Sequence, residues 1–344
     1  MSQVRVEQRD ARDESAVLLK VRNLEVVFEK QRGLVRREKL QIRAVDNVSF
    51  DLQESEFVSI VGETGSGKST LAKCLVRLQN PTSGSIIYGG KDIAQMNQRR
   101  LREYRREVQM IFQDPFESLL PRHDVYSAVS TPIRNLRGEK NHERLYDMTS
   151  RLLEEVGLEP GVIMRRLPHQ LSGGQRQRVS IARALASDPS VLIADEPITM
   201  LDAAQRLNVL SLLMELRSKR KLTVLMITHD ISSAKITSDR VIVMYLGKVI
   251  EIGKAESVVS SYHHPYVELI LSSHTRLRSS APQEIGGKSG EIGEARPVTG
   301  CVFEPRCRYS TDVCKKVEPQ LAEISPLHYA SCHNPLNIKR PEAS

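Results

Sequence analysis

The glycine-rich stretch G-E-T-G-S-G-K-S at residues 62–69 constrains the fold of this chain more than any other feature. An apolar run at 57–61 precedes it and a helix is predicted over 71–76, so the stretch has the strand, loop and helix context of the P-loop pattern G-x-x-x-x-G-K-[ST]. Glycines let successive backbone N–H groups point at one anion, and the helix adds the positive end of its dipole. An ordinary glycine-rich turn is the alternative, but it would not require the complete pattern.

Side chains in this loop have separate expected roles. Lys68 can reach the β- and γ-phosphates of a nucleoside triphosphate, and the Ser69 hydroxyl can coordinate Mg²⁺. The residues expected to surround the triphosphate are Gly62, Glu63, Thr64, Gly65, Ser66, Gly67, Lys68, Ser69 and Thr70. The stretch therefore predicts that the chain binds a nucleoside triphosphate.

Composition narrows the classes of protein that remain. The 344 residues include 40% hydrophobic and 27% charged residues, which is ordinary for a globular protein of about two domains. No apolar run approaches the roughly 20 residues that span a bilayer, and the N-terminus lacks the apolar core of a secretory signal, so we expect a cytoplasmic chain that can dock on a membrane protein. The absence of Trp argues against a platform that stacks nucleic-acid bases.

Four segments are predicted along the chain. Residues 1–17 are polar without periodicity and are expected to form a flexible extension. Residues 18–272 form the nucleotide-binding domain, 273–300 have the composition of a linker, and 301–344 form a small cysteine-rich extension. The chain is thus predicted to consist of one large domain and one small C-terminal unit.

Apolar strands alternate with helices in the large domain. Strands are predicted at 57–61, 191–194 and 223–227, and a helix at about 203–219. This alternation indicates an α/β fold whose largely parallel sheet is covered on both faces. Residues 29–43 are basic and weakly patterned, and they are predicted to form a loop or hairpin tip.

Two adjacent acids follow a buried strand. Asp195 is expected to hold Mg²⁺ beside the Ser69 oxygen, and Glu196 to polarise a water for attack on the γ-phosphorus. The alternative is a solvated acidic turn, which the presence of a P-loop in the same chain disfavours.

A second glycine-bearing loop, L-S-G-G-Q at 171–175, precedes another helical stretch. It offers a Ser172 hydroxyl, backbone N–H groups freed by glycine and a helix N-terminus, which together suit an anion. Either both loops face one nucleotide within the monomer, or each completes a site on a partner.

Four of the five cysteines lie in the C-terminal segment: Cys301, Cys307, Cys314 and Cys332. Disulfides are disfavoured in a reducing cytoplasm, and such clustering disfavours four unrelated thiols, so a Cys₄ metal centre is predicted. The spacing lacks the C-x₂-C knuckles usual for structural zinc, which favours an iron–sulfur cluster and leaves Zn²⁺ open.

These motifs, taken in chain order, resemble the ATP-binding subunit of an ABC transporter over about residues 18–272. The matching stretches are Gly62–Thr70, Gln113, Leu171–Gln175, Asp195-Glu196, Asp202 and His229. The resemblance implies a P-loop NTPase fold with a RecA-like core, an antiparallel β-subdomain and a helical subdomain. It also implies a head-to-tail dimer, in which the loop of Ser172 contacts ATP held by the partner's P-loop.

The same resemblance implies the roles of individual residues. Gln113 would link the Mg²⁺ site to the membrane subunits, His229 would hold the γ-phosphate and Phe28 would stack on adenine. The expected catalytic residues are Lys68, Gln113, Glu196 and His229. The expected Mg²⁺ ligands are Ser69, Gln113 and Asp195. Contacts to ATP beyond the P-loop are expected from Phe28, Gln113, Ser172, Gly173, Gly174, Gln175, Asp195, Asp202 and His229.

The C-terminal segment resembles the extension of the oligopeptide/dipeptide branch of these ATPases. The matching residues include His264-Pro265-Tyr266, Gly300-Cys301, Phe303, Arg306-Cys307, Cys314, Pro319 and Cys332. In that branch the cysteines are associated with a [4Fe–4S] cluster, and two different ATPase subunits usually pair. One departure is Met200, because the loop before Asp202 usually has Ala at that position; its bulk could alter coupling between the two sites.

Together these features predict an ATPase subunit that powers import of di- or oligopeptides or similar small solutes. Expected partners are a second, paralogous ATPase subunit, two transmembrane permease subunits and, indirectly, an extracytoplasmic solute-binding protein, with no nucleic acid. The expected location is peripheral, on the cytoplasmic face of the inner membrane. The alternative is a soluble ABC-type ATPase that acts on nucleic acid or ribosomes.

Overall fold

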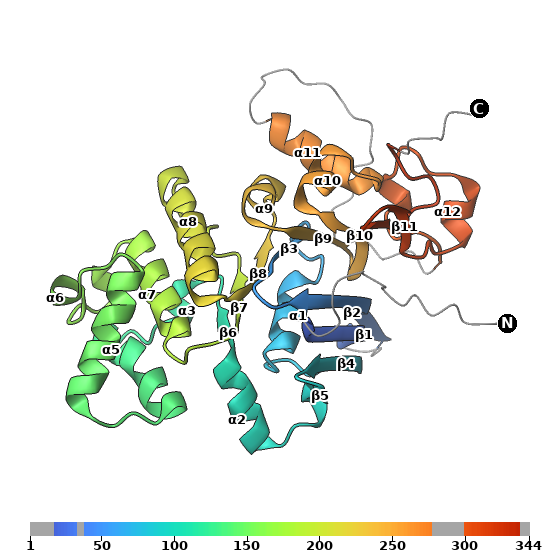
Figure 1. The fold of residues 1–344 in the computed structure, drawn as a ribbon. Helices are drawn as coiled ribbons and strands as arrows, with labels where there is room; N and C mark the ends of the chain where they lie inside the picture. Colours follow the sequence, from blue (N-terminus) through green and yellow to red (C-terminus); the bar gives the residue numbers. More distant parts are fainter. Residues whose placement is uncertain (1–16, 33–37, 277–298, 338–344) are drawn as a thin grey trace.

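The computed structural model describes residues 17–32, 38–276 and 299–337 (Figure 1). The predicted N-terminal extension therefore lies outside the described residues except for Val17. The same is true of most of the predicted linker, residues 277–298, and of the last residues of the chain, 338–344.

A small antiparallel sheet lies beside the P-loop helix, as expected for the β-subdomain. Its order is β2-β1-β4-β5, with the bounds β1 (Val17–Arg32), β2 (Glu38–Gln53), β4 (Ser83–Tyr88) and β5 (Lys91–Asp92). Of the two alternatives for 29–43, the loop is wrong for most of that range, because the strands of a hairpin occupy it and the β1–β2 ladder continues to the pair Arg32↔Glu38. Backbone hydrogen bonds extend the hairpin through residues 29–32, whose charged and polar side chains show no apolar alternation. The hairpin tip, 33–37, lies outside the described residues.

The large sheet has the order β11-β12-β10-β9-β3-β8-β7-β6 among the described residues. Its strands are β3 (Phe57–Val61), β6 (Val108–Ile111), β7 (Val191–Asp195), β8 (Thr223–Thr228), β9 (Arg240–Tyr245), β10 (Lys248–Lys254), β11 (Ala322–Ser325) and β12 (His328–Ala330). The strands from β9 to β6 pair in parallel, whereas β10, β12 and β11 continue the sheet in antiparallel fashion. Strands β3, β7 and β8 are fully buried, as their apolar sequences predict.

Helices cover both faces of this sheet (Figure 1). The helices of the described residues, not all of which touch the sheet, are α1 (Lys68–Leu75), α2 (Gln98–Glu107), α3 (Pro115–Ser118), α4 (Val125–Pro132), α5 (His142–Glu155), α6 (Pro160–Ile163), α7 (Gly173–Leu185), α8 (Ala203–Arg220), α9 (Ile231–Thr237), α10 (Ala255–Ser260), α11 (Pro265–Arg276) and α12 (Asp312–Lys316). Alternate residues of β7 contribute to separate cores: Ile193 packs with α1, and Leu192 packs with α7 and α8. The predicted α/β P-loop NTPase fold is confirmed.

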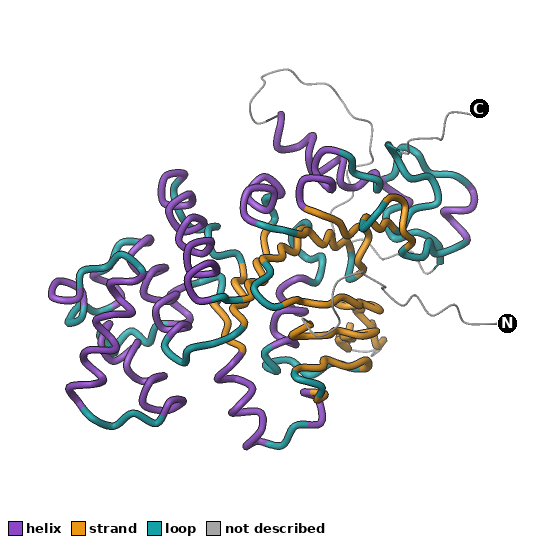
Figure 2. The backbone as a smooth tube through the Cα atoms, in the orientation of Figure 1, coloured by secondary structure: helices purple, strands orange, loops and turns teal. Residues whose placement is uncertain are grey.

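The segment after residue 298 packs directly on the large sheet. Figure 2 shows that it consists mostly of loops and turns, with short strands and one short helix. Strand β12 pairs with β10 in the register Glu251↔Ala330, and Phe303 is buried against Tyr245 and Tyr266. The C-terminal segment thus shares both a sheet and an apolar core with the rest of the molecule.

Candidate functional site

The candidate site lies where three neighbouring parallel strands end. Strand β3 pairs with β8 up to Val61↔Thr228, and β7 pairs with β8 up to Asp195↔Ile227. Because parallel strands present their carboxyl ends at one edge, the P-loop, the two acids and His229 follow strands that end side by side.

Close backbone contacts shape the P-loop. Gly67 has φ +98°, and a Cβ built there would lie 2.0 Å from the carbonyl oxygen of Ala44. Gly62 is equally confined, since its Cβ would lie 2.2 Å from the Met244 carbonyl oxygen. Both positions therefore admit only glycine, and the loop cannot relax without moving β2 or β9.

The Lys68 ammonium group is held inside this loop. Its Nζ donates to the carbonyl oxygens of Gly62 at 2.7 Å and Glu63 at 2.8 Å, and to Ser66 Oγ at 3.3 Å. Burial lowers the pKa of Lys68, and the nearby carboxylates of Glu196, Asp195 and Glu63 oppose that shift. A phosphate group would therefore supply a charged partner to a partly desolvated cation.

Ser69 and Asp195 are brought together as the sequence predicted for a Mg²⁺ site. The Ser69 hydroxyl donates to Asp195 Oδ1 at 3.1 Å. Burial raises the pKa of Asp195, while the hydrogen bond from Ser69 opposes the shift. Two oxygen ligands beside a phosphate-binding loop suit a hard divalent cation such as Mg²⁺.

Three side chains contact the carboxylate of Glu196. Its Oε2 lies 2.8 Å from Thr199 Oγ1, 3.3 Å from Gln113 Nε2 and 3.5 Å from His229 Nδ1. The hydrogen bond with His229 lowers the pKa of Glu196 and raises that of His229. Glu196 also has φ +46°, a left-handed conformation that is unusual outside glycine and is common at functional sites. Thr199 was not predicted as a site residue, since its hydroxyl is placed by the turn after β7.

The second glycine loop begins α7. Ser172 and Gln175 form a reciprocal capping box, in which Gln175 N–H donates to Ser172 Oγ at 3.2 Å and Ser172 N–H donates to Gln175 Oε1 at 3.0 Å. Ser172 and Gly173 are exposed, whereas a Cβ on Gly174 would lie 2.8 Å from Gln205 Oε1. This loop therefore presents its first residues to the surface on a rigid helix end.

One cavity joins several predicted residues. It has a volume of about 200 Å³, and its lining includes Gln113, Gly173, Glu196 and Met200. Met200 is 62% exposed, so its side chain is open to a partner molecule. Asp202 instead caps α8, where its carboxylate accepts the Gln205 N–H at 2.9 Å.

Two other predicted residues have different surroundings. Phe28 lies on β1 opposite Ile42 and is 40% exposed, so its ring is not part of the core. The Glu63 carboxylate does not point at Lys68 but accepts two hydrogen bonds from Arg306 of the C-terminal segment, which raise the pKa of that guanidinium.

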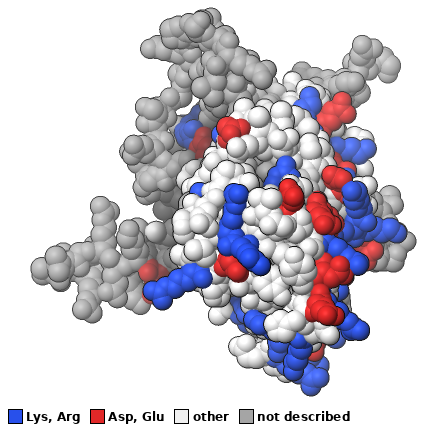
Figure 3. Space-filling view, turned by 90° about the vertical axis from the view of Figure 1, so that its left-hand side faces the viewer, with Lys and Arg blue, Asp and Glu red and all other residues white. Residues whose placement is uncertain are grey.

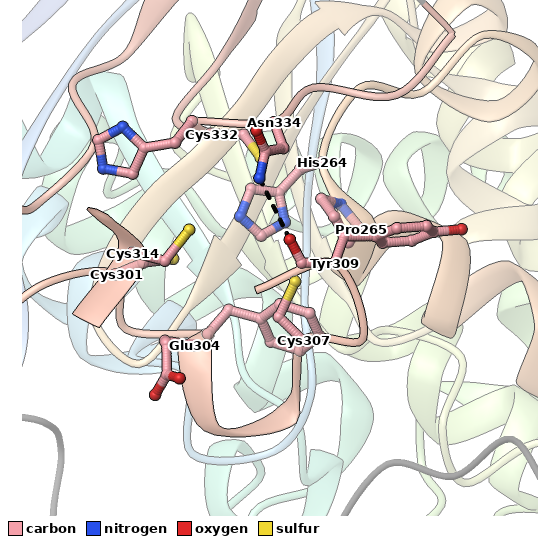
Figure 4. Close-up of a pocket in the computed structure, with 11 residues that line it drawn as sticks. His264, Pro265, Cys301, Glu304, Cys307, Tyr309, Cys314, Cys332 and Asn334 are labelled. Carbon is pink, nitrogen blue, oxygen red and sulfur yellow. Dashed lines mark hydrogen bonds between the residues drawn. The ribbon is translucent and has the colours of Figure 1, made fainter. Parts of the chain in front are cut away.

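The four clustered cysteines line a single pocket of about 10 Å³ (Figure 4). The pKa of Cys301 is raised to about 11 and that of Cys332 to about 12, mainly because both thiols are buried. Repulsion from the neighbouring thiols adds to both shifts. His264 borders the same pocket, and its buried Nε2 has no hydrogen-bond partner within the described part of the chain. No group of three or more His, Cys, Asp or Glu residues among those described has the arrangement of a metal site.

Residues 17–32, 38–276 and 299–337 contain no helix that could cross a membrane. None of the helices there combines the necessary length and hydrophobicity.

Comparisons with known proteins agree with this geometry. Residues 45–199 match the family described as "ABC transporter", and 250–314 match "Oligopeptide/dipeptide transporter, C-terminal region". The chain is 40% identical over 326 residues to the "Oligopeptide transport ATP-binding protein AppF" of Bacillus subtilis, covering 92% of this chain and 97% of that protein.

Solved structures give the same result. The fold is similar to a dimeric, post-hydrolysis structure of the ATP-binding cassette MJ0796 bound to ADP and Pi, with a TM-score of 0.62 and 32% identity over 69% of this chain and 99% of that one. It is also similar to cbiO1 of Clostridium perfringens, part of an ABC transporter complex, with a TM-score of 0.61 and 28% identity over 77% and 96% of the two chains. The chain belongs to the ABC transporter family, as an ATP-binding subunit.

Proposed function

We propose that this protein is the ATP-hydrolysing subunit of an ABC importer for peptides or similar small solutes. The observation that carries the proposal is the meeting of Lys68, the Ser69–Asp195 pair and Glu196 at one edge of the sheet. Peptide import is supported by the match of residues 250–314 to the oligopeptide/dipeptide transporter region and by the name of the Bacillus subtilis relative.

Hydrolysis follows from the positions of these side chains. Lys68 and the P-loop N–H groups would bind the β- and γ-phosphates, and Phe28 would stack on the adenine. Ser69 and Asp195, with Gln113, would hold Mg²⁺, which supplies charge neutralisation on the phosphates when bound. Glu196 is ionised because its pKa is lowered, so it can accept a proton from an attacking water. Its carboxylate is held in place by Gln113, Thr199 and His229.

The complete site is proposed to need two ATP-binding subunits. Ser172 and Gly173 are exposed and would contact ATP on a partner, and the neighbouring Gly174, Gln175 and Asp202 are proposed to contribute to the same contact. Dimeric structures of the similar cassette MJ0796 support a site that is completed by a second subunit. We propose that the partner is a second, paralogous ATPase, and that both subunits dock on two permease subunits at the cytoplasmic face of the inner membrane, with an extracytoplasmic solute-binding protein delivering the solute.

The charge on one face of the molecule favours this proposal over an ATPase that acts on nucleic acid. On the face drawn in Figure 3, basic and acidic side chains are interspersed. Nucleic-acid binding typically relies on a basic strip that follows the phosphate backbone.

For the cysteine pocket we propose a [4Fe–4S] cluster held by Cys301, Cys307, Cys314 and Cys332. Four thiols around one pocket form a soft donor set that suits iron–sulfur clusters or Zn²⁺, and the unpartnered His264 Nε2 leaves a polar atom for a bound group. An absorption spectrum of anaerobically purified protein distinguishes the two, because an iron–sulfur cluster absorbs visible light and Zn²⁺ does not. A colourless protein with stoichiometric zinc would contradict the cluster.

Substitution of Glu196 tests the catalytic proposal. Glu196→Gln keeps the size of the side chain and removes the proton acceptor, so we expect hydrolysis to fall by about 10²- to 10⁴-fold while ATP binding persists. Undiminished turnover would refute the role of Glu196. Co-purification with two integral membrane subunits supports the transporter, whereas an isolated chain that binds ribosomes or DNA would contradict it.

A further inference from the structure

The C-terminal segment contacts the P-loop through an ion pair. Arg306 Nη1 donates to Glu63 Oε2 at 2.8 Å, and Arg306 Nη2 donates to Glu63 Oε1 at 3.1 Å. The two side chains are 21% and 30% exposed, so the pair is partly shielded from water. Two parallel hydrogen bonds fix the orientation of both groups, which a single charged contact would not.

The backbone of Glu63 makes hydrogen bonds to several parts of the P-loop and its surroundings. Its N–H donates to the Tyr266 hydroxyl at 2.9 Å, and its carbonyl oxygen accepts from Lys68 Nζ at 2.8 Å and from Ser66 N–H at 3.2 Å. The residue that binds Arg306 therefore also holds the ammonium group expected to bind the phosphates. A displacement of Glu63 would move Lys68 with it.

Arg306 lies on a turn that backbone hydrogen bonds hold in place. It ends the short 3₁₀ helix Glu304–Arg306, which lies between two cysteines of the pocket. Glu304 N–H donates to the Cys301 carbonyl oxygen at 3.0 Å, and Cys307 N–H donates to the Glu304 carbonyl oxygen at 3.1 Å. The turn that carries Arg306 is thus hydrogen-bonded to a cysteine at each end.

An aromatic cluster fixes this turn against the sheet. Phe303 is 2% exposed, and its ring centroid lies 5.3 Å from that of Tyr245 and 5.5 Å from that of Tyr266. The guanidinium carbon of Arg306 lies 5.7 Å from the centroid of Tyr245. Tyr266 therefore contacts both the P-loop and the turn, so the two move as one packed unit.

We propose that Arg306 is a positioning residue for the ATP site, through which the four-cysteine segment sets the geometry of the P-loop. Arg306 holds Glu63, and Glu63 holds Lys68, in the arrangement that receives the phosphates. Because Cys301 and Cys307 flank the turn of Arg306, a group held by their thiols, such as the proposed cluster, would support this turn, and its loss would alter ATP affinity. This inference rests on the proposed ATP site.

Nucleotide titration of the full-length subunit tests the proposal. We expect Arg306→Gln to raise the Kd for Mg-ATP by roughly three- to tenfold, because a loop that is no longer held in place must be ordered on binding. Arg308→Gln is the matched control. Arg308 lies two residues after Arg306 in the same segment, pairs with Glu268 and does not contact the P-loop. The control should bind ATP as tightly as the unchanged protein.

A double variant distinguishes positioning from general damage. If Arg306 acts through Glu63, Arg306→Gln should have no further effect on the Kd in a Glu63→Gln background, and Arg306→Lys should restore part of the affinity. Additive losses in the double variant, or an unchanged Kd in Arg306→Gln, would overturn the proposal.

A cysteine variant tests the link to the pocket. Cys307→Ser should weaken ATP binding in the unchanged background and have no further effect in the Arg306→Gln background. Equal losses in both backgrounds would overturn the link. Failure of the proposed function has a different signature, because neither the unchanged protein nor Arg308→Gln would then bind Mg-ATP.

Discussion

Glu251 should control how firmly the C-terminal segment is attached to the nucleotide-binding core. It is fully buried in β10, where Oε1 accepts from His263 N–H at 2.9 Å and contacts His328 Nε2 at 2.7 Å, and Oε2 accepts from His264 N–H at 2.6 Å. One carboxylate thus joins β10, the turn before α11 and β12. In Glu251→Gln, an amide NH₂ replaces one oxygen and faces a backbone N–H, which leaves a buried donor unsatisfied.

The magnitude follows from that lost hydrogen bond. A buried unsatisfied donor costs about 1–3 kcal/mol. Because 1.4 kcal/mol corresponds to tenfold, local opening should become roughly 5- to 150-fold more frequent. Hydrogen–deuterium exchange measured by mass spectrometry reports this opening directly, as faster exchange in peptides that contain His263, His264 and the strand of His328.

Glu256→Gln is the control for this experiment. Glu256 lies nearby on α10 and is exposed, so the same chemical change there should leave exchange in these peptides unaltered. If Glu251→Gln exchanges at the rate of the unchanged protein, the carboxylate does not hold the segment and the reasoning is refuted.

Two further predictions concern the ATP site. The hydrogen bond between His229 and Glu196 raises the pKa of His229 above its ordinary 6.5 and lowers that of Glu196 below its ordinary 4.5, so this pair stabilises the folded state fully between pH 4.5 and 6.5 and less as pH rises through the folded pKa of His229. An NMR titration of the imidazole should show that pKa fall in Glu196→Gln; an unchanged value would contradict the pairing. Gly67→Ala should abolish ATP binding, since its Cβ would lie 2.0 Å from the Ala44 oxygen, whereas Gly161→Ala, with nothing within 4 Å, should bind normally in the same nucleotide titration.

Much of the fold could be predicted because its signals are local. The P-loop, the apolar strand before Asp195 and the helix predicted at about 203–219 each place their pattern within a short stretch of sequence. The loop alternative was wrong for 29–32, because those polar residues join the strand through backbone hydrogen bonds, and for 38–43, where the alternation of Leu40 and Ile42 lies among charged and polar residues.

The sequence by itself determined which residues we propose to bind phosphate and Mg²⁺, since the motif around Lys68 and the acids at the end of β7 are defined by residue type and spacing. Only the tertiary structure decided which contacts support the site and the C-terminal segment. These are the hydrogen bond of Thr199 to Glu196, those of two backbone N–H groups to Glu251, and those of Arg306 to Glu63, which lies 243 residues away. The contact of Thr199 with Glu196 is local to the turn after β7, whereas the contacts of Glu251 with His328 and of Arg306 with Glu63 join segments that no local pattern relates. Their geometry depends on how the C-terminal segment packs on the sheet, and the packing of the complete chain alone sets that.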